Sequence, residues 1–275
     1  DRVLFSAQGI TKRELIDHYL RVADVMLPHI VNRPLSLVRC PRGQEKDCFF
    51  QKHASQGWPE EFRAVKIKEK SGSGEYLYIE DVKGLIAAVQ MGVLELHIWG
   101  SHADEVEKPD RMVFDLDPDE GLKFSAVIDA ALDLRKRFKA ISLEIFAMAS
   151  GGKGIHVVVP LRSGHSWDQH REFAEAMARV MAEENPERYV ATMSKARRKG
   201  KIFVDYLRNQ RGATAISPYS SRAHKGASYA VPVSWASLKK LKNGRPASVG
   251  DKSKANPWND YEKVDQPLPI GKHLR

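Results

Sequence analysis

The chain has 275 residues, with 44 Lys and Arg against 35 Asp and Glu, and a formal net charge of +9. This length fits one elaborated α/β domain or two tightly fused halves, and the basic balance indicates a face that meets a polyanion, with nucleic acid the leading partner. The lack of an apolar run of about 18 residues and of a signal-peptide pattern argues against a membrane protein.

The cysteine pattern argues against two kinds of scaffold. Cys40 and Cys48 are the two cysteines of the chain and lie outside any Cys-x-x-Cys pattern, so neither a disulfide framework nor a zinc ribbon is expected, and both thiols should be reduced. A metal cluster of Cys40, Cys48 and His53 would lack a suitably spaced fourth ligand. Because the chain begins at Asp1 without an initiator Met, we expect a domain cut from a longer protein.

The amino-terminal region predicts a mixture of helices and short strands. Thr11 and Glu14 have capping-box spacing, and the apolar positions after them recur at helical spacing until Pro28. Turn-rich segments, including a Gly-rich turn at 71–74, separate the elements that follow. These are strands at 35–39, 49–53 and 76–80, a helix at 81–90 and a strand at 93–99.

The rest of the chain predicts a second sheet with flanking helices. Ser166 and Gln169 again have capping-box spacing, at the start of a long amphipathic pattern. The expected elements are strands at 111–115, 143–148, 155–159, 202–205 and 228–231, and helices at 124–138, 167–184 and 234–241. After Lys242 the chain is rich in Pro, Gly, Asn and Lys, which predicts an irregular tail that wraps the body or leads to another domain.

Two carboxylates end the strand that begins at Arg111. Successive side chains of a strand alternate, so Asp115 and Asp117 would share a face about 6 to 7 Å apart, and Pro118 would end the strand and leave the pair at an open rim. An exposed strand end is often rich in Asp for solvation alone. A third strand ending in Asp205, with a Gly-rich basic loop between the two acidic motifs, favours two-metal phosphoryl transfer instead.

The Gly-rich loop at 150–154 joins two predicted strands, so it is not a Walker loop, and a hairpin turn is its simplest interpretation. Its backbone amides, Lys153 and the nearby His156 would still suit a triphosphate, although a lone His in an apolar strand is more often structural. Arg208 and Arg222 could clamp a triphosphate or the template backbone through bidentate contacts. Solvated loop charge is the alternative for both arginines.

Two further segments give weaker signals. The run 195–201 is dense in Lys and Arg without apolar interleaving, which favours a solvated surface over DNA contact. Phe49 and Phe50 form an adjacent aromatic pair, which usually places one ring in the core. The other ring could stack on an unpaired base for roughly 1 to 3 kcal/mol.

Several of these motifs together resemble the polymerase domain of bacterial DNA ligase D, in the archaeo-eukaryotic primase superfamily. They are Asp115-Leu116-Asp117-Pro118 and the segments 150–157, 203–209 and 33–41, and the similarity covers nearly the whole chain in order. The resemblance implies an α/β (α+β) fold with a primase-polymerase core of two β-sheets flanked by helices and an RRM-like catalytic half. Residues 1–275 would form one domain, with DNA-end contacts in 1–100, a catalytic core at 101–241 and an irregular tail at 242–275.

The resemblance also implies roles for single residues. By similarity, Asp115, Asp117 and Asp205 are catalytic and bind metal, and Phe49 or Phe50 meets the template or incoming base. Arg2 and Lys12 would hold a 5′-phosphate at a gap or break. The expected ligands of the incoming nucleotide are Ser150, Lys153, His156, Arg208, Thr214 and Arg222.

The resulting hypothesis is a template-directed nucleotidyltransferase, that is, a DNA-directed DNA or RNA polymerase. It would add ribo- or deoxyribonucleotides, ATP among them, to a primer 3′-hydroxyl at gaps and double-strand breaks. The resemblance implies manganese as cofactor, with magnesium possible, and a role in bacterial nonhomologous end joining in the cytoplasm and nucleoid. The implied partners are DNA with 5′-phosphorylated gaps or ends, Ku, and the ligase and phosphoesterase domains of a longer chain, without which joining itself is not expected.

Two alternatives stay open at this point. The same acids could activate water in a metal-dependent nuclease, and the basic surface alone would suffice for a non-catalytic DNA-end-binding module. A labelled primer-template incubated with manganese separates the three hypotheses, because extension, shortening and binding without reaction are distinct outcomes.

Overall fold

The computed structural model describes residues 2–271, which divide into two compact units. Unit 1 holds the chain up to Val106 together with Thr214–Val231 and Ala247–Asn256. Unit 2 holds Glu107–Ala213, Pro232–Pro246 and the chain from Pro257 on. The chain therefore enters each unit more than once. The subdivision at residues 100 and 241 that the resemblance implies stays a prediction.

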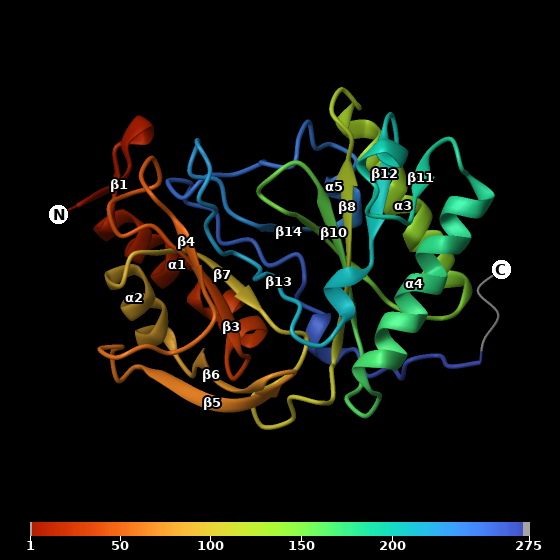
Figure 1. The fold of residues 1–275 in the computed structure, drawn as a ribbon. Helices are drawn as coiled ribbons and strands as arrows, with labels where there is room; N and C mark the ends of the chain where they lie inside the picture. The colour runs from red at the N-terminus through yellow and green to blue at the C-terminus, as the bar shows by residue number, and fades with distance from the viewer. Residues whose placement is uncertain (1, 272–275) are drawn as a thin grey trace. The chain divides into compact units, whose positions relative to one another are not determined.

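Unit 1 is a mixed α/β body (Figure 1). Its main sheet has four strands in the order β13-β7-β3-β4, and two further pairs, β1-β2 and β5-β6, form antiparallel ribbons within the described residues. The elements are β1 (Val3–Phe5), β2 (Ile10–Thr11), α1 (Lys12–Ile30), β3 (Leu35–Arg39), β4 (Phe49–Gln51), β5 (Phe62–Glu69), β6 (Gly72–Ile79), α2 (Val82–Gln90), β7 (Val93–Ile98) and β13 (Ala215–Ile216).

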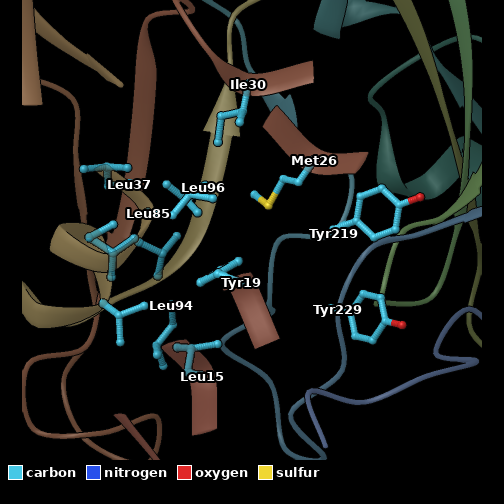
Figure 2. Close-up of a cluster of buried hydrophobic side chains, with 14 of the residues drawn as sticks. Leu15, Tyr19, Met26, Ile30, Leu37, Leu85, Leu94, Leu96, Tyr219 and Tyr229 are labelled. Atoms are coloured by element: carbon cyan, nitrogen blue, oxygen red, sulfur yellow. The ribbon is translucent and has the colours of Figure 1, made fainter. Parts of the chain in front are cut away.

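The core of unit 1 lies between the four-stranded sheet and the helices α1 and α2 (Figure 2). Leu94 and Leu96 of β7 belong to this core, and Tyr19 of α1 and Leu85 of α2 contribute to it from the helices. Successive residues of a strand point to opposite faces. The residue between the two leucines, Glu95, therefore lies on the face of the sheet turned away from this core.

Unit 2 is built on a six-stranded sheet in the order β11-β12-β8-β10-β9-β14 (Figure 1). All of its pairings with β8 and β10 are antiparallel, and β11 and β12 run parallel. The elements are β8 (Arg111–Pro118), α3 (Phe124–Ala140), β9 (Phe146–Ala149), β10 (Ile155–Pro160), α4 (Trp167–Glu184), β11 (Tyr189–Val190), β12 (Ile202–Asp205), β14 (Val231–Val233) and α5 (Trp235–Leu238), with 3-10 turns η2 (Lys195–Arg198), η3 (Leu207–Asn209) and η4 (Tyr261–Lys263).

Helices α3 and α4 pack on one face of the six-stranded sheet. Phe114 of β8 contacts Phe138 of α3, with ring centroids 5.5 Å apart, and Phe138 contacts Phe173 of α4 at 6.3 Å. Both Phe114 and Phe138 are fully buried. Asp115, the next residue of β8, must therefore point to the other face.

The helix starts agree with the sequence to within one residue, whereas the ends of α1, α3 and α5 differ from the prediction. Thr11 and Ser166 both form complete capping boxes, and Asp81 caps α2 through the amides of Lys83 and Gly84. Helix α1 was predicted to end at Pro28 but continues to Ile30, because a proline in the last turn removes only one amide donor and Ile30 is fully buried. Within residues 2–271, no helix is both long and apolar enough to cross a membrane.

Several strand predictions needed correction. β5 was missed, because most of its residues are exposed and Ala64-Val65 break the alternation of polar and apolar residues. The predicted turn at 71–74 lies largely inside β6, where Ser73 pairs with Lys68. The strand expected at 228–231 begins only at Val231, while Ser228 makes a single bridge to Ser248.

For the carboxy-terminal region, the structure corrects the predicted helix and agrees with the predicted irregular tail. The helix expected at 234–241 is the single turn α5. The tail is irregular apart from η4, as predicted. Within unit 2 it is anchored by Trp258, whose indole donates to the carbonyl of Ala147, and by Gln266, whose amide donates to the carbonyls of Glu144 and Pro160.

The prediction of reduced thiols is wrong for this structure, in which Cys40 and Cys48 form a disulfide. The reason is strand register: Arg39 lies opposite Phe49 in the antiparallel β3-β4 pair, so the residues that follow Arg39 and precede Phe49 also face each other. Their Cα atoms are 4.3 Å apart. The bond also removes both thiols from the hypothetical metal cluster with His53. The eight-residue spacing gave no hint of this pairing, because the sequence predicts the two strands and a turn at 41–43 between them but not the register in which the strands pair.

Candidate active site

Three carboxylates lie on the face of the six-stranded sheet that is turned away from α3 and α4. Asp205, the last residue of β12, is directly opposite Asp115 of β8, and Asp117 lies opposite Phe203. Directly opposite residues of an antiparallel pair share a face, with Cβ atoms about 4.5 to 5.5 Å apart. Strand β8 ends at Pro118, as the sequence predicted, so the acids sit at the end of the strand.

The closeness of these acids affects their ionisation. Burial, together with the negative charge of Asp115, raises the pKa of Asp117 above its ordinary value. The same two causes raise the pKa of Asp205, which is 8% exposed, although Arg208 acts in the opposite direction. The folded chain therefore concentrates negative charge that a bound cation would neutralise.

His156 completes the row of residues beside Asp115. It lies opposite Asp115 on the other neighbouring strand, β10, and its Nε2 is 3.5 Å from Asp115 Oδ1. The side chain is buried, and its Nδ1 has no hydrogen-bond partner within the part of the chain that the structure describes. His156 is thus both a buried strand residue and a neighbour of the acids. Its position is compatible with both interpretations of the sequence, a structural His and a residue of the site.

Arg208 lies between two of the acids, on the 3-10 turn η3 that follows Asp205. Its Nη2 is 3.4 Å from Asp115 Oδ2 and its Nε is 3.5 Å from Asp205 Oδ2. The next residue, Asn209, fixes this turn, because its buried amide accepts from the Val113 amide and donates to the Val113 carbonyl. The role of Asn209 was not predicted from the sequence, although the residue belongs to the motif 203–209 and could have been singled out on that ground.

Arg198 is a second cation that sequence analysis missed at this site. The run 195–201 was interpreted as a solvated surface, but the Arg198 guanidinium stacks 3.7 Å from the centroid of Phe203 and its Nη1 is 3.9 Å from Asp117 Oδ2. The solvated interpretation is therefore wrong for Arg198. The antiparallel pairing of β8 and β12 brings residues just before β12 beside the end of β8, so recognising that pairing would have revealed this position.

The Gly-rich loop is a hairpin turn between β9 and β10, as its simplest interpretation predicted. The Ser150 hydroxyl donates to the carbonyl of Gly154 and accepts from the amide of Gly152, so it shapes the turn from within. A Cβ on Gly154 would lie 2.5 Å from the Leu116 carbonyl oxygen, so only glycine allows the hairpin to pack this closely on the acidic strand. Lys153 is exposed, 3.7 Å from Glu120.

A pocket of about 620 Å³ adjoins this hairpin. It is lined by residues after the acidic strand, from Pro118 to Phe124, by Gly152 and Lys153 of the hairpin, and by Asn243, Gly244 and Arg245. The amide of Gly151 donates to the carbonyl of Gly244, which ties the hairpin to that last segment. The volume is in the usual range for small-molecule sites, about 300 to 1,000 Å³.

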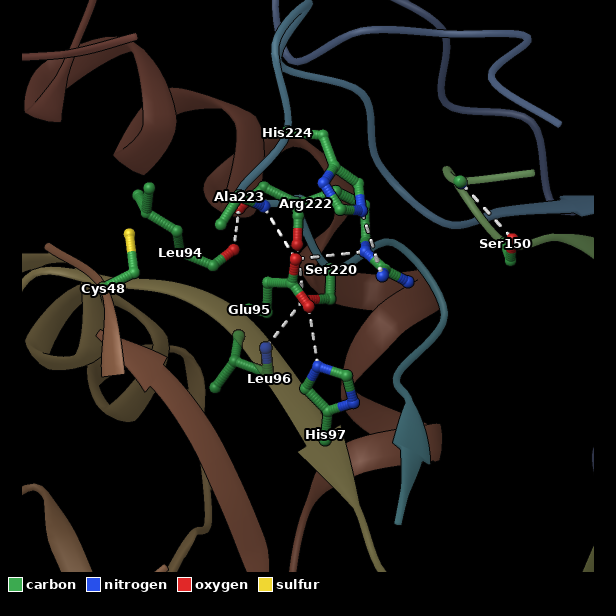
Figure 3. A network of polar contacts seen from close by, with 12 residues as sticks. Cys48, Leu94, Glu95, Leu96, His97, Ser150, Ser220, Arg222, Ala223 and His224 are labelled. Atoms are coloured by element: carbon green, nitrogen blue, oxygen red, sulfur yellow. Dashed lines mark hydrogen bonds and ion pairs between the residues drawn. The ribbon is translucent and has the colours of Figure 1, made fainter. Parts of the chain in front are cut away.

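Two of the predicted nucleotide ligands, Thr214 and Arg222, belong to unit 1 and not to the unit that carries the acids. Thr214 is half-buried directly before β13. Arg222 is held by the buried carboxylate of Glu95, at 3.2 Å, which also binds His97 (Figure 3). Glu95 and His97 were missed, although two ionisable residues two positions apart in an apolar strand were a signal.

The predicted DNA-contact residues also lie in unit 1. The backbone amide of Lys12 donates to the Arg2 carbonyl, and the Lys12 ammonium donates to the Gln90 carbonyl at 2.8 Å. The Arg2 guanidinium donates to the carbonyl of Pro41. Partial burial, with the nearby charge of Arg2, lowers the pKa of Lys12. The two cations are thus close together beside the loop that the disulfide closes.

Neither ring of the aromatic pair belongs to the core, contrary to the usual pattern for adjacent aromatics. Phe49 is 46% and Phe50 68% exposed. Phe49 lies 5.5 Å from the guanidinium of Arg39, and the Phe50 ring centroid is 6.0 Å from that of His97. Both rings therefore keep part of their surface exposed to solvent.

The acids fit a hard divalent cation by their donor chemistry. Carboxylate oxygens are the ligands that magnesium and manganese prefer. The pKa values of Asp117 and Asp205 are raised by burial and by the charge of Asp115, and a bound cation would offset both effects. Within residues 2–271, no group of His, Cys, Asp or Glu side chains already encloses an ion site, and Arg208 occupies the position between Asp115 and Asp205. Binding would therefore require the Arg208 side chain to yield this position.

Comparison with known proteins places this arrangement in a family. Residues 11–255 match the family model described as LigD, primase-polymerase domain. The chain belongs to the LigD primase-polymerase family. The resemblance seen in the sequence motifs is thereby confirmed, and so is the expected α/β fold with two main sheets flanked by helices.

The LigD relatives are longer proteins. The chain is 37% identical over 263 residues to the multifunctional non-homologous end joining protein LigD of Pseudomonas aeruginosa, covering 93% of this chain and 31% of that protein. It is 28% identical to the bifunctional LigD of Bacillus subtilis, covering 86% of this chain and 38% of that protein. The chain thus spans about a third of the curated relatives it matches.

A solved LigD structure has the same fold. The polymerase domain of Mycobacterium tuberculosis ligase D, determined in complex with DNA, superposes with a TM-score of 0.84 and 32% sequence identity. The match covers 90% of this chain and 89% of that chain.

Proposed function

We propose that this LigD-family chain is a template-directed nucleotidyltransferase that extends a primer 3′-hydroxyl at gaps and double-strand breaks in nonhomologous end joining. The observation that carries the proposal is the row formed by Asp205, Asp115 and His156 on three neighbouring strands, with Asp117 two residues along the central strand. Such a row of acids on one sheet face suits phosphoryl transfer, which depends on positioning and charge more than on covalent chemistry.

In this proposal Asp115, Asp117 and Asp205 hold divalent metal, manganese or magnesium. When bound, the metal supplies activation of the primer hydroxyl and neutralisation of the leaving pyrophosphate. Arg198 and Arg208 contact the acids, so they set the charge at the site before metal binds and would turn to phosphate afterwards. The attack takes place in line at the α-phosphate of the incoming nucleotide.

The remaining residues would bind substrate. Ser150 holds the hairpin in the shape that presents its amides and Lys153 to the triphosphate, and His156 orients Asp115. The pocket of about 620 Å³ beside this hairpin has room for such a ligand. Thr214 and Arg222 stay proposed ligands of the nucleotide. Ribo- and deoxyribonucleotides, ATP among them, are the proposed substrates.

DNA ends are the proposed macromolecular substrate. The M. tuberculosis relative was solved with DNA, and this chain has a net charge of +9 with exposed Phe49 and Phe50. Arg2 and Lys12 would bind a 5′-phosphate, and the two rings would stack on bases. Ku, together with ligase and phosphoesterase domains of a longer chain, completes the proposed set of partners. The Pseudomonas aeruginosa relative is named a multifunctional non-homologous end joining protein.

A primer-extension assay tests the proposal. A gapped duplex with a labelled primer is incubated with manganese or magnesium, with and without nucleotides, using the wild-type chain, Asp115→Asn and the surface control Asp168→Asn. Extension by the wild type and by Asp168→Asn, but not by Asp115→Asn, is the expected result. Shortening of the primer would indicate a nuclease, and binding without reaction a DNA-end-binding module; either outcome overturns the proposal.

A further inference from the structure

A disulfide closes the loop between β3 and β4 in unit 1. Cys40, directly after β3, is fully buried, whereas Cys48, directly before β4, is exposed. The residues between them, 41–47, are mostly exposed as well. A reagent in solution can therefore reach this bond from the Cys48 side. The chemistry at the acids of unit 2 gives the bond no role.

The closed loop is attached to strand β1, which follows Arg2. The amide of Gln44 donates to the carbonyl of Leu4 at 2.7 Å, and the Arg2 guanidinium donates to the carbonyl of Pro41. Gly43 has a φ of 102°, and a Cβ there would lie 3.3 Å from the Leu4 carbonyl oxygen, so glycine lets the loop lie against β1. Leu4 itself is fully buried in the core of unit 1. The loop thus rests on a fixed strand and supplies the acceptor that holds the Arg2 side chain.

Neighbouring elements hold Lys12 close to the same loop. β1 pairs with β2, and Lys12 follows β2 directly, so its amide donates to the Arg2 carbonyl at 2.9 Å. The Lys12 ammonium donates to the carbonyl of Gln90, the last residue of α2. Two positions further on, the carbonyl of Gly92 accepts from the amide of Cys40 at 2.7 Å. The two cations and the disulfide are therefore joined by a continuous set of contacts within unit 1.

We propose that this disulfide is a redox-sensitive device that sets how well Arg2 and Lys12 bind a 5′-phosphate. The inference rests on the proposed function, in which these two cations bind the phosphate at a gap or break. When the bond is intact, the loop and the guanidinium attached to it are ordered in advance, so little freedom is lost when a phosphate binds. When the bond is reduced, the exposed part of the loop gains freedom, and ordering it again weakens binding.

Thiol–disulfide exchange with a small thiol converts one state into the other. A thiolate attacks the exposed Cys48 sulfur, a mixed disulfide forms, and the Cys40 sulfur leaves as a thiolate that takes up a proton. A second small thiolate attacks the small-thiol sulfur of the mixed disulfide and releases Cys48, which also takes up a proton. Two small thiols thus pass two electrons and two protons to the protein and become one small disulfide, which reverses the reaction.

A purely structural role is the competing explanation. A disulfide stabilises a chain chiefly by restricting its unfolded state, whatever lies near the bond. Reduction would then lower the melting temperature without changing the choice between DNA ends. The ratio of affinities for 5′-phosphorylated and 5′-hydroxyl duplexes separates the two explanations, because a general loss of folded protein weakens binding of both duplexes alike.

The test measures this ratio for gapped duplexes at one moderate salt concentration and well below the lower melting temperature. The wild-type chain is treated with oxidised glutathione or with dithiothreitol, and its redox state is verified by thiol titration and intact mass. We expect reduction to lower the ratio by about threefold or more. The matched control is Cys48→Ser, which removes the accessible sulfur without changing the charge. It should behave like the reduced wild type after both treatments.

An equal ratio in the two redox states would overturn the inference and leave the proposed 5′-phosphate site intact. No preference for the phosphate in either state would overturn both. A wild-type chain that forms no internal disulfide in oxidised glutathione would overturn the inference as well. Failure of the proposed polymerase function is recognised separately, as absence of extension on a primer-template that has no downstream strand and hence no 5′-phosphate at a gap.

Discussion

Asp205 lies directly opposite Asp115 across the antiparallel pairing of β12 and β8. The pairing joins residues 90 positions apart and places two carboxylates on one face without any contribution from a loop. Because the register of both strands is fixed by the buried residues on their other face, the separation of the acids is fixed as well.

Asp205→Asn should abolish extension while DNA binding stays nearly intact. The substitution keeps the size of the side chain and its hydrogen bond from the Leu207 amide, but removes a charge that serves the transition state. We expect a loss of about 100-fold or more in the rate of primer extension. Gel-shift affinity for the same duplex is the control, and near-normal extension by Asp205→Asn would refute the metal-site assignment.

Divalent metal should stabilise the folded chain, and the acids should destabilise it when metal is absent. A raised carboxyl pKa means that the ionised form is disfavoured by folding; this unfavourable contribution is absent below the ordinary value of 3.8 and grows as the pH rises through the raised pKa. Without metal, Asp117→Asn should therefore gain melting temperature over the wild type at pH 7 and lose that gain toward pH 4.

Manganese should reverse this order. It should raise the melting temperature of the wild type by several degrees, given roughly 2 to 4 °C per kcal/mol for a chain of this size, and raise that of Asp117→Asn less. Scanning calorimetry with a chelator, and then with metal, makes both measurements. A metal response that is the same in the two proteins would contradict the site.

His156→Gln should lower extension per folded molecule. The His156 imidazole is buried and 3.5 Å from Asp115, so its loss should misplace that acid more than it unfolds the sheet. We expect a decrease of about tenfold or more in kcat, with the activity corrected for the folded fraction measured by circular dichroism. If the variant melts several degrees lower and its activity only follows the folded fraction, His156 is a core residue alone.

Arg198 and Arg197 offer a matched pair of adjacent arginines. Arg198 stacks on Phe203 and reaches Asp117, whereas Arg197 is exposed. Replacing either removes one positive charge, so general attraction to DNA should fall equally in both. Arg198→Ala should in addition slow extension by about tenfold relative to Arg197→Ala, measured at saturating DNA. Equal rates in the two variants would instead support the interpretation of the run 195–201 as a solvated surface.

Lys12 should contribute to preference for a 5′-phosphate. Its ammonium is held by the Gln90 carbonyl close to Arg2, so two cations are available to one phosphate at the start of a rigid helix. Binding to a gapped duplex should favour the 5′-phosphorylated over the 5′-hydroxyl form at the same moderate salt, and Lys12→Ala should reduce that ratio. Lys83→Ala, at an exposed lysine of α2, should weaken both forms alike. Equal affinity of the wild type for the two duplexes would remove this site.

The elements that were predicted correctly carry signals within a few neighbouring residues, whereas the features that were missed have weak local signals or depend on contacts between distant residues. Capping boxes at Thr11 and Ser166 and the run ending in Asp205 are local, and they predicted the starts of α1 and α4 and the bounds of β12. Ribbon β5 was missed because its residues are mostly solvent-exposed and alternate weakly. The disulfide was missed because it depends on the register of β3 against β4, which no local pattern in the sequence reveals.

The residues of the candidate site also fall into those predictable from local pattern and those that depend on distant contacts. Asp115 and Asp117 on one face follow from alternation within a single strand, and this part could be predicted. Arg198 reaches Asp117 because β12 pairs with β8, and its residue type alone suggested ordinary surface charge. Glu95 contacts Arg222 because the chain returns to β7, and nothing in the sequence indicated this contact. Arg222 was singled out from its sequence context, but the carboxylate that holds it was not.

The repeated return of the chain to each unit also limits how the gene can be divided. A fragment that stops at residue 241 looks complete from its helix and strand patterns, yet it would lack Ala247–Asn256 of unit 1 and the stretch from Pro257 on of unit 2. Trp258 and Gln266, which fill positions against β9 and β10, would be missing from it. An expression boundary for studies of the acids should therefore lie beyond Gln266, and neither unit can be produced as one uninterrupted stretch of coding sequence.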